Sequence, residues 1–357
     1  MKILIATGIY PPEIGGPATY AVLVETEFKK RGHEVRILPF RVVRKYPSLI
    51  RHFLFFIKVL KHAFWADIVL AQDTVSVGLP SVLACKILMK PIVVRVPGDF
   101  AWEQGVQRFG VKESIDDFQK KKYGFRVELL RSVQKFVVKK ADFVMTPSDY
   151  FKSIVSFWGV HSQRLQRVYN GVSIPENILP KEFTKKTIVS SGRLVPWKGF
   201  DTLIKCISKV DANLVIVGEG DDRKRLEDLV IENKVSDKVS FTGSLKREEL
   251  LSFISGSSLF VLPSSFESFS FQLVEAMMLG STVVALDAGN LNEIIKNGEN
   301  GVLIEKTKID NLPEILNSLL VDEGLRSKLS SSAKEDSKKF SIDKTVDEVE
   351  NIFKKLL

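Results

Sequence analysis

The chain has 357 residues, of which 45% are hydrophobic, and it carries a formal net charge of +9. This length exceeds the roughly 250–300 residues at which one hydrophobic core stops growing, and the composition excludes a disordered chain. No apolar run reaches the ~18 residues of a membrane span, and the apolar start is too short for a signal peptide, so we expect a cytoplasmic protein that is soluble or peripheral to the membrane.

Short β-branched runs alternate with longer helical patterns, which is typical of parallel sheets covered by helices on both faces. The strands expected in the first half are residues 2–6, 34–38, 67–71, 91–96, 142–146 and 166–169. Those expected in the second half are residues 187–191, 213–217, 238–241, 259–262, 282–285 and 301–304. The two sets predict an α/β protein with two doubly wound, Rossmann-like domains.

The break between the two sets of strands gives the predicted domain boundaries. Prolines and charged residues interrupt the pattern there, so we expect a first domain over residues 1–172, a linker over 173–186 and a second domain over 187–340. Residues 341–357 have apolar side chains at helical spacing, which predicts a C-terminal helix that packs back on the first domain.

The loop after the first expected strand, residues 8–17, holds Gly15 and Gly16 just before a helical pattern. Because these residues lack side chains, backbone N–H groups can approach a phosphate or a sugar at the helix N-terminus. The loop is too long for the dinucleotide fingerprint and lacks its third glycine. A plain turn is the alternative.

Arg193 and Lys198 flank a turn after the first strand of the second half. Arginine offers a planar fork of donors and lysine a point charge, so both suit one diphosphate. Two solvated cations are the alternative, but cations at a helix N-terminus oppose its dipole, and a bound anion would remove that conflict.

Glu267 and Glu275 stand eight positions apart around the start of another expected helix. Ser268 or Ser270 can cap this helix, which places Glu267 in the loop before it and Glu275 about two turns inside. The first N–H groups of the helix can meet a phosphate, Glu275 can accept two ribose hydroxyls, and Glu267 can face a sugar. The alternative is a capping acid and an ordinary helical glutamate.

The segment from Glu267 to Glu275 resembles the paired-glutamate motif of glycosyltransferase family 4, the retaining family with the two-domain GT-B fold. Other resemblances follow in the family's order along the chain. They are the glycine loop Gly15-Gly16, the turn Asn170-Gly171-Val172, the pair Arg193 and Lys198, the loop Gly218-Glu219-Gly220, and the loop Phe241-Thr242-Gly243 beside the nucleobase.

This resemblance implies two domains that face each other across a cleft and a nucleotide-diphosphate sugar as donor. It implies catalytic roles for Glu267, Asp99, Arg193 and Lys198. The implied donor-binding residues are Gly15, Gly16, Arg193, Lys198, Gly218, Gly243, Phe269, Ser270, Phe271 and Glu275. We expect no cofactor and no metal, because Arg193, Lys198 and a helix N-terminus can hold the diphosphate, and no aspartate pair suited to a metal lies near these motifs.

Asp99 marks the one departure from the family pattern. Many members carry a His-Asp pair after the fourth strand of the first domain, whereas this sequence reads Val96-Pro97-Gly98-Asp99. The resemblance supports Asp99 as a contact of the transferred sugar and leaves the role of the histidine unassigned.

Residues 41–65 combine apolar side chains with six cations and no acid; the cations are Arg41, Arg44, Lys45, Arg51, Lys58 and Lys61. This pattern is typical of a helix that lies in a membrane interface, and it predicts contact with an anionic membrane surface. The alternative is a solvated cationic face on a core helix. No nucleic-acid-binding module is recognisable, so no nucleic-acid partner is expected.

The motifs together predict a glycosyltransferase that acts on a sugar or a lipid-linked acceptor, in the synthesis of glycolipid, cell wall or surface polysaccharide. Two alternatives keep the fold: a sugar-nucleotide epimerase, and a catalytically degenerate protein that only binds a nucleotide sugar. The intact set of Arg193, Lys198, Glu267 and Glu275 opposes the second alternative.

Overall fold

A computed structural model describes residues 1–13 and 15–357, so Ile14 of the loop over residues 8–17 lies outside the described residues. The chain divides into unit 1, Met1–Gly171 with Ile342–Leu357, and unit 2, Val172–Ser341. The residues expected to form a linker, 173–186, are grouped with unit 2. Within the described residues, no helix is both long and apolar enough to cross a membrane.

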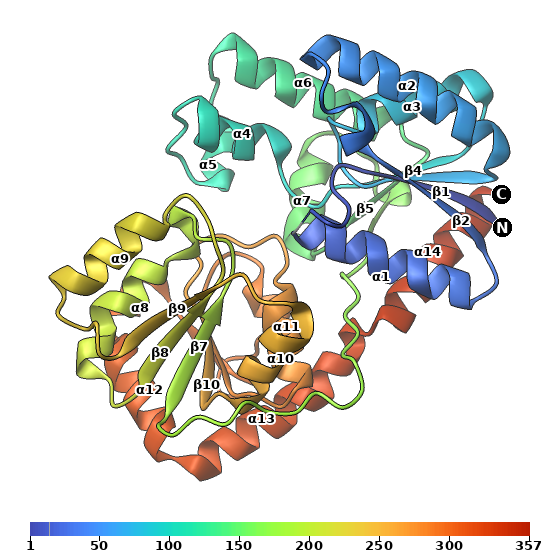
Figure 1. Cartoon of the computed structure of the whole chain (residues 1–357). Coiled ribbons are helices and arrows are strands. Elements are labelled where there is room, and N and C mark those ends of the chain that lie inside the picture. The colour runs from blue at the N-terminus through green and yellow to red at the C-terminus, as the bar shows by residue number, and fades with distance from the viewer. Residues whose placement is uncertain (14) are drawn as a thin grey trace. The chain divides into compact units, whose positions relative to one another are not determined.

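Unit 1 contains a parallel six-stranded sheet in the order β2-β1-β3-β4-β5-β6 (Figure 1). Its strands are β1 (Lys2–Thr7), β2 (Glu34–Pro39), β3 (Ile68–Ala71), β4 (Ile92–Arg95), β5 (Phe143–Thr146) and β6 (Leu165–Arg167). Its helices are α1 (Gly16–Lys30), α2 (Ser48–Trp65), α3 (Gly78–Leu88), α4 (Phe100–Arg108), α5 (Ile115–Lys120), α6 (Phe125–Lys140), α7 (Asp149–Phe157) and α14 (Ile342–Leu356). The central strands β3 and β4 are buried at every residue, as expected of a sheet covered on both faces.

Helices α2, α3 and α6 lie on one face of this sheet, and α1 and α14 lie on the other (Figure 1). The C-terminal helix α14 packs on α1 through Phe353, whose ring stacks on that of Phe28 at 5.7 Å between centroids. Arg31 at the end of α1 adds an ion pair with Asp347 at 2.6 Å. The last helix of the chain is therefore part of unit 1.

Unit 2 contains a second parallel six-stranded sheet, in the order β12-β11-β10-β7-β8-β9. Its strands are β7 (Thr187–Ser191), β8 (Asn213–Val217), β9 (Val239–Gly243), β10 (Leu259–Leu262), β11 (Val283–Leu286) and β12 (Val302–Ile304). Its helices are α8 (Phe200–Cys206), α9 (Arg223–Glu232), α10 (Arg247–Gly256), α11 (Phe271–Met278), α12 (Leu312–Val321) and α13 (Glu323–Ser337). The predicted fold class, two Rossmann-like α/β domains, is confirmed.

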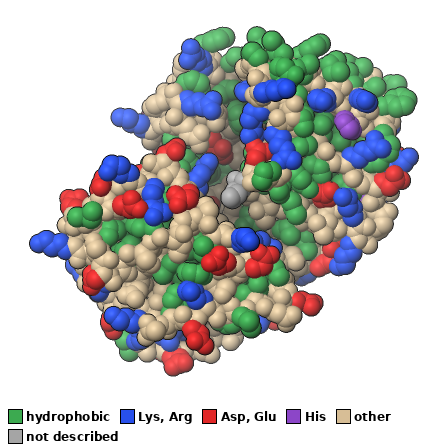
Figure 2. Space-filling view, in the orientation of Figure 1, with side chains coloured by type: hydrophobic (Ala, Val, Ile, Leu, Met, Phe, Trp, Pro, Cys, Tyr) green, Lys and Arg blue, Asp and Glu red, His purple; other side chains and the backbone are tan. Residues whose placement is uncertain are grey.

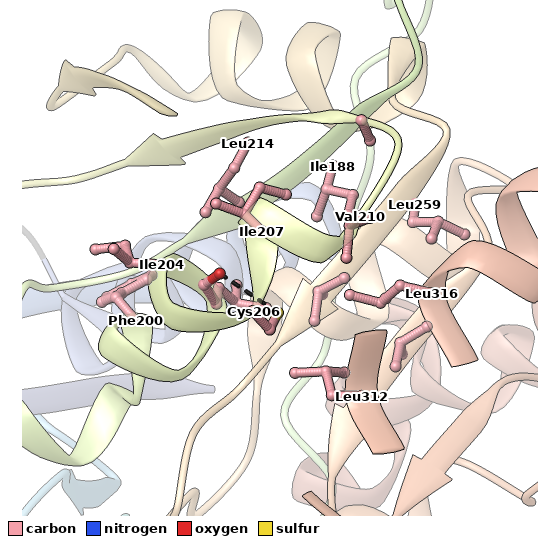
Figure 3. Close-up of a cluster of buried hydrophobic side chains, with 14 of the residues drawn as sticks. Ile188, Phe200, Ile204, Cys206, Ile207, Val210, Leu214, Leu259, Leu312 and Leu316 are labelled. Atoms are coloured by element: carbon pink, nitrogen blue, oxygen red, sulfur yellow. Dashed lines mark hydrogen bonds between the residues drawn. The ribbon is translucent and has the colours of Figure 1, made fainter. Parts of the chain in front are cut away.

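The core of unit 2 lies between its sheet and the helices α8, α9 and α12. Figure 3 shows Ile188 and Leu214 from the sheet meeting Phe200 and Ile204 of α8 and Leu316 of α12. These side chains are all at most 2% exposed, so this face of the sheet is fully covered. The packing fixes β7, whose carboxyl end carries one of the loops that hold the candidate site.

The chain enters and leaves unit 2 at one place. The N–H of Val172 donates to the carbonyl of Phe340 at 2.8 Å, and Val172 pairs with Ser341 as an isolated parallel bridge. On the side of unit 1, a Cβ built on Gly171 would lie 2.7 Å from Cα of Ile342, so no larger residue fits there without a shift. The two connections between the units therefore run next to each other.

Candidate active site

The loops that follow β7 and β8 in unit 2 contact each other through their backbones. The N–H of Leu194 donates to the carbonyl of Glu219 at 2.9 Å, and the N–H of Gly192 donates to that of Val217 at 3.0 Å. Gly218 has φ 144°, and a Cβ there would lie 1.9 Å from the carbonyl oxygen of Gly192. Only glycine permits this approach, which explains Gly218 in the predicted donor-binding set.

The loop after β8 also joins the loop after β9. The N–H of Gly218 donates to the carbonyl of Gly243 at 2.9 Å. Beside them, the guanidinium of Arg223 lies 4.7 Å from the centroid of the Phe241 ring, and its Nη1 is 3.1 Å from Oε1 of Glu219. The loops that carry Gly218 and Gly243, expected from sequence to bind the donor, are thus adjacent in unit 2.

The loop after β10 packs against the loop after β7, since these strands are neighbours in the sheet. The N–H of Ser265 donates to the carbonyl of Trp197 at 2.9 Å. Gly199 has φ 69°, and a Cβ there would lie 2.2 Å from the carbonyl oxygen of Pro263. This close backbone contact brings Lys198 to Glu267, whose Nζ and Oε1 atoms are 2.5 Å apart.

Arg193 lies in the same loop as Lys198, but its side chain is exposed. Its guanidinium carbon is 5.7 Å from the centroid of the Trp197 ring. Among the described residues, no carboxylate forms an ion pair with Arg193. Its charge is therefore available to an anion from solution.

Helix α11 begins directly after the loop that holds Glu267. The hydroxyl of Ser270 accepts the N–H of Leu273 at 3.3 Å, so Ser270 is the cap that the sequence left open between two serines. Phe269 and Phe271 are buried with their rings edge to face at 5.7 Å. In this structure the two aromatic side chains anchor the start of α11, so any contact with a phosphate must come from the backbone.

Glu275, in the second turn of α11, is 4% exposed, and burial raises the pKa of its carboxyl group. Arg247 at the start of α10 counters this effect, because its Nη2 and Nε lie 2.8 and 3.1 Å from Oε1 of Glu275. Arg247 Nη2 also donates to the carbonyl of Ser173 at 2.5 Å. Oε1 of Glu275 is thus engaged by Arg247.

In unit 1, Gly15 precedes α1 with φ 152°, and Gly16 is the first residue of the helix. Arg41 and Arg44 hold the loop before it: Arg44 forms an ion pair with Glu13 and donates to the carbonyl of Gly8 at 3.0 Å. Arg41 donates to the carbonyls of Tyr10 and Pro11. These two arginines, which the sequence grouped with a membrane-binding stretch, therefore fix a loop of unit 1 instead.

Asp99, predicted from the resemblance to contact the transferred sugar, is held by hydrogen bonds within unit 1 in this structure. Its side chain is 0% exposed and caps α4 by accepting the N–H of Trp102 at 3.0 Å. The amides of Gln134 and Gln119 donate to its two oxygens at 2.9 and 2.8 Å. Burial raises the pKa of Asp99, and these hydrogen bonds oppose the rise. Asp99 is therefore a structural residue of unit 1 in this structure.

The two halves of the chain match two family models, both of glycosyltransferases. Residues 14–175 match the model described as Glycosyltransferase Family 4, and residues 175–336 match the model described as Glycosyl transferases group 1. The chain belongs to family 4 of the glycosyltransferases. The resemblance inferred from its motifs is thereby confirmed.

Similar proteins include two uncharacterized glycosyltransferases of Methanocaldococcus jannaschii. One is 33% identical over 222 residues, which is 62% of this chain and 62% of that protein. The other is 26% identical over 388 residues, 99% of this chain and 98% of that protein. Among solved structures, Anabaena HepE in complex with UDP and glucose has a TM-score of 0.80 and 19% identity, and each chain is covered completely. At this identity, HepE shows that the fold is shared.

Two polar residues of this glycosyltransferase lie in the candidate site without having been predicted from sequence. Asn290, 1% exposed, donates to the carbonyl of Ser268 at 2.5 Å and so holds the loop with Glu267. Its position after β11 was a usable signal, because it marks the carboxyl edge of the sheet. The other residue is Arg247, and no local sequence pattern marks it.

Among the described residues, no group of three or more His, Cys, Asp or Glu side chains is placed to hold a metal ion.

Proposed function

We propose that this family 4 glycosyltransferase transfers a hexose, with retention of configuration, from a nucleotide-diphosphate sugar to an acceptor hydroxyl. The observation that carries the proposal is the pairing of Lys198 with Glu267 directly before the capped N-terminus of α11. A cation, a carboxylate and helix N–H groups beside one another suit a phosphate that is bonded to a sugar.

The diphosphate is the leaving group, so negative charge develops on it as the bond to the anomeric carbon breaks. Lys198 and the exposed Arg193 come from one loop after β7 and can both offset this charge. The N-terminus of α11 adds oriented N–H groups. Because these groups stabilise the leaving diphosphate, we propose that transfer needs no divalent metal.

Glu267 and Glu275 then bind different parts of the donor. Glu267 precedes α11 and orients the transferred sugar, whereas Glu275 lies farther along the helix and accepts the ribose hydroxyls. Arg247 supports the charged form of Glu275 by its two short contacts. Retention of configuration rests on membership of family 4.

The acceptor is a sugar or a lipid-linked sugar in our proposal, and the process is the synthesis of glycolipid, cell wall or surface polysaccharide. For the donor, HepE offers a starting point, because it shares the fold and binds UDP and glucose. UDP-glucose is accordingly the first donor to test.

The test is a panel of nucleotide-diphosphate sugars incubated with the full chain, with release of the nucleotide diphosphate as the readout. Each donor is tested with and without lipid-linked acceptors, and with and without a chelator. We expect release from one donor, dependent on acceptor and unchanged by chelation, and an NMR spectrum of the product with the donor's anomeric configuration. Release from no donor would contradict the transferase proposal, and activity that returns only with magnesium or manganese would contradict metal independence.

A further inference from the structure

Helix α2 exposes a row of large apolar side chains on the side away from its sheet. It buries Phe55, Val59 and Ala63. On its opposite side Ile50, Phe53, Ile57 and Phe64 are exposed, with Phe53 at 63% and Phe64 at 78%. Their spacing of three, four and seven residues places them on one stripe of the helix. A side chain can enter a membrane only if it is not buried in the protein core, and these four side chains are exposed.

Helices α3 and α6 extend the exposed apolar surface. They lie in the same layer as α2, since α3 contacts α2 on one side and α6 on the other. The exposed apolar side chains of this part are Leu83 and Ile87 of α3, Met89 just after it, and Phe125, Leu129 and Phe136 of α6. We call the solvent side of α2, α3 and α6 the outer face of unit 1. A contiguous apolar surface of this kind marks an interaction site.

The same three helices are almost free of acids. Their sequences contain a single acidic residue, Glu128, and it is paired with Arg131 at 2.7 Å. The exposed cations on them are Lys58, Lys61, Lys86, Arg126, Lys139 and Lys140. Figure 2 shows hydrophobic side chains beside Lys and Arg over the part of unit 1 where Figure 1 places α2 and α6. Such a surface matches an anionic partner that also offers hydrocarbon.

A pocket of about 510 Å³ opens between α3 and α6 on this face. Leu83 and Phe136 form apolar walls, and its cations are Lys86, Lys139, Lys140 and Arg164. Its one acid, Asp142, is paired with Lys86 at 2.5 Å. Within the described chain, Lys139 and Lys140 have no acidic partner. Cations next to apolar walls suit the phosphate of a lipid and the acyl chain attached to it.

The pocket lies at the opposite edge of the sheet from the loops that carry Gly15 and Asp99. Those loops follow the carboxyl ends of β1 and β4, whereas Lys140 and Asp142 immediately precede the amino end of β5. In a parallel sheet these are opposite edges. A lipid in the pocket is therefore not the acceptor of the transfer reaction; it would hold the protein at the membrane.

We propose that the outer face of unit 1, formed by α2, α3 and α6, binds an anionic membrane surface and holds a lipid phosphate in the pocket between α3 and α6. The cations attract the anionic headgroups, and Phe53, Phe64 and Phe125 insert between them. The binding is reversible and sensitive to salt, because none of the described helices is long and apolar enough to cross the bilayer and the attraction is screened.

The experiment is co-sedimentation of the purified full chain with vesicles of phosphatidylcholine alone, or of phosphatidylcholine mixed with phosphatidylglycerol, at low and high salt. We expect binding only to the mixed vesicles and its loss at high salt. The pocket variant Lys139→Gln/Lys140→Gln should bind about 25-fold more weakly, since each near-surface cation contributes roughly fivefold. The apolar variant Phe53→Ser/Phe64→Ser should also bind more weakly, and because both side chains are exposed it should stay folded.

The matched control is Lys328→Gln/Lys334→Gln, which removes the same charge from exposed positions of α13 in unit 2. It should bind as the unchanged protein does. The proposal is overturned if the unchanged protein ignores the mixed vesicles at low salt, or if the control loses as much binding as the pocket variant. The readout needs no donor or acceptor, so its result is independent of the proposed transfer reaction.

Discussion

Lys198 Nζ lies 2.5 Å from Glu267 Oε1, although 69 residues separate the two along the chain. They come together because β7 and β10 are adjacent parallel strands, and their carboxyl-end loops share a backbone contact at Gly199 and Pro263. Both side chains are largely shielded from water. Each side chain therefore holds the other in place. A phosphate that binds Lys198 would replace the carboxylate of Glu267 as its partner.

Replacing Glu267 by glutamine should abolish transfer while the fold survives. Glutamine keeps the size of the side chain but loses the charge that pairs with Lys198 and orients the sugar. We expect turnover to fall by at least ~10², with a melting temperature close to that of the unchanged protein. The measurement is nucleotide release together with thermal unfolding. Glu299→Gln, at an exposed position, is the control and should keep full activity; near-normal turnover by folded Glu267→Gln would remove Glu267 from the site.

Replacing Lys198 by alanine should weaken donor binding and slow turnover by ~10²–10³, because in our proposal the lysine contacts the diphosphate on which charge develops. The rate is measured at saturating donor, with Lys209→Ala, an exposed lysine of unit 2, as control. Since Lys198 and Glu267 act as a pair, the double variant should be little slower than either single variant. Full additivity of the two losses, or an unchanged rate for Lys198→Ala, would contradict this pairing.

The strands were predictable because burial on both faces makes them continuous apolar runs. All twelve lie within two residues of their expected bounds; β1, for example, was expected over 2–6 and spans Lys2–Thr7. The sequence also placed the glycine loops and the two glutamates after the carboxyl ends of strands, where the structure has them, and their roles in binding remain predictions. Arg247 was not, because its contact with Glu275 joins residues 28 positions apart and leaves no local pattern.

Asp99 shows a second reason why sequence alone does not predict every residue's role. A motif gives the residue type at a strand end but not the direction of its side chain. Aspartate is a preferred N-cap residue, and Asp99 caps α4 by accepting the N–H of Trp102.

Asp99→Ala should therefore affect stability rather than chemistry. It removes the cap of α4 and leaves the buried amide of Gln134 without this acceptor. We expect the free energy of unfolding to drop by about 2–4 kcal/mol in urea titrations. Turnover per folded molecule of the variant should stay within a few-fold of that of the unchanged protein. A large loss of turnover at unchanged stability would restore the role of Asp99 as a sugar contact.

Arg247→Met should make donor binding depend on pH. Burial already raises the pKa of Glu275, and loss of the opposing charge of Arg247 raises that pKa further. Near neutral pH the carboxyl group is then protonated more often, so affinity for the nucleotide diphosphate should fall by about tenfold and recover as pH rises. Fluorescence titrations in acidic and alkaline buffers measure this change, and Arg247→Lys should keep most of the affinity at every pH.

The stability of Arg247→Met should change with pH in the opposite direction. A folded-state pKa above the unfolded value means that the folded protein holds a proton which the unfolded chain releases. The variant is thus most stable below the pKa of an unfolded glutamate and loses stability as pH rises through the raised folded-state pKa. A variant whose affinity and stability are both independent of pH would show that Arg247 does not control the charge of Glu275.

The adjacent connections at Gly171–Val172 and Ser341–Ile342 make unit 2 a cassette inserted into unit 1. Val172 and Ser341 pair with each other at the ends of unit 2, and Gly171 contacts Ile342 at the facing ends of unit 1. Each unit therefore has its two chain ends side by side. Two neighbouring cuts would release the whole of unit 2, to which we assign the donor in our proposal, with its ends together. We therefore expect that the corresponding unit of a relative can be grafted at the same two points without a designed linker, which would give hybrid enzymes for testing which unit selects the sugar.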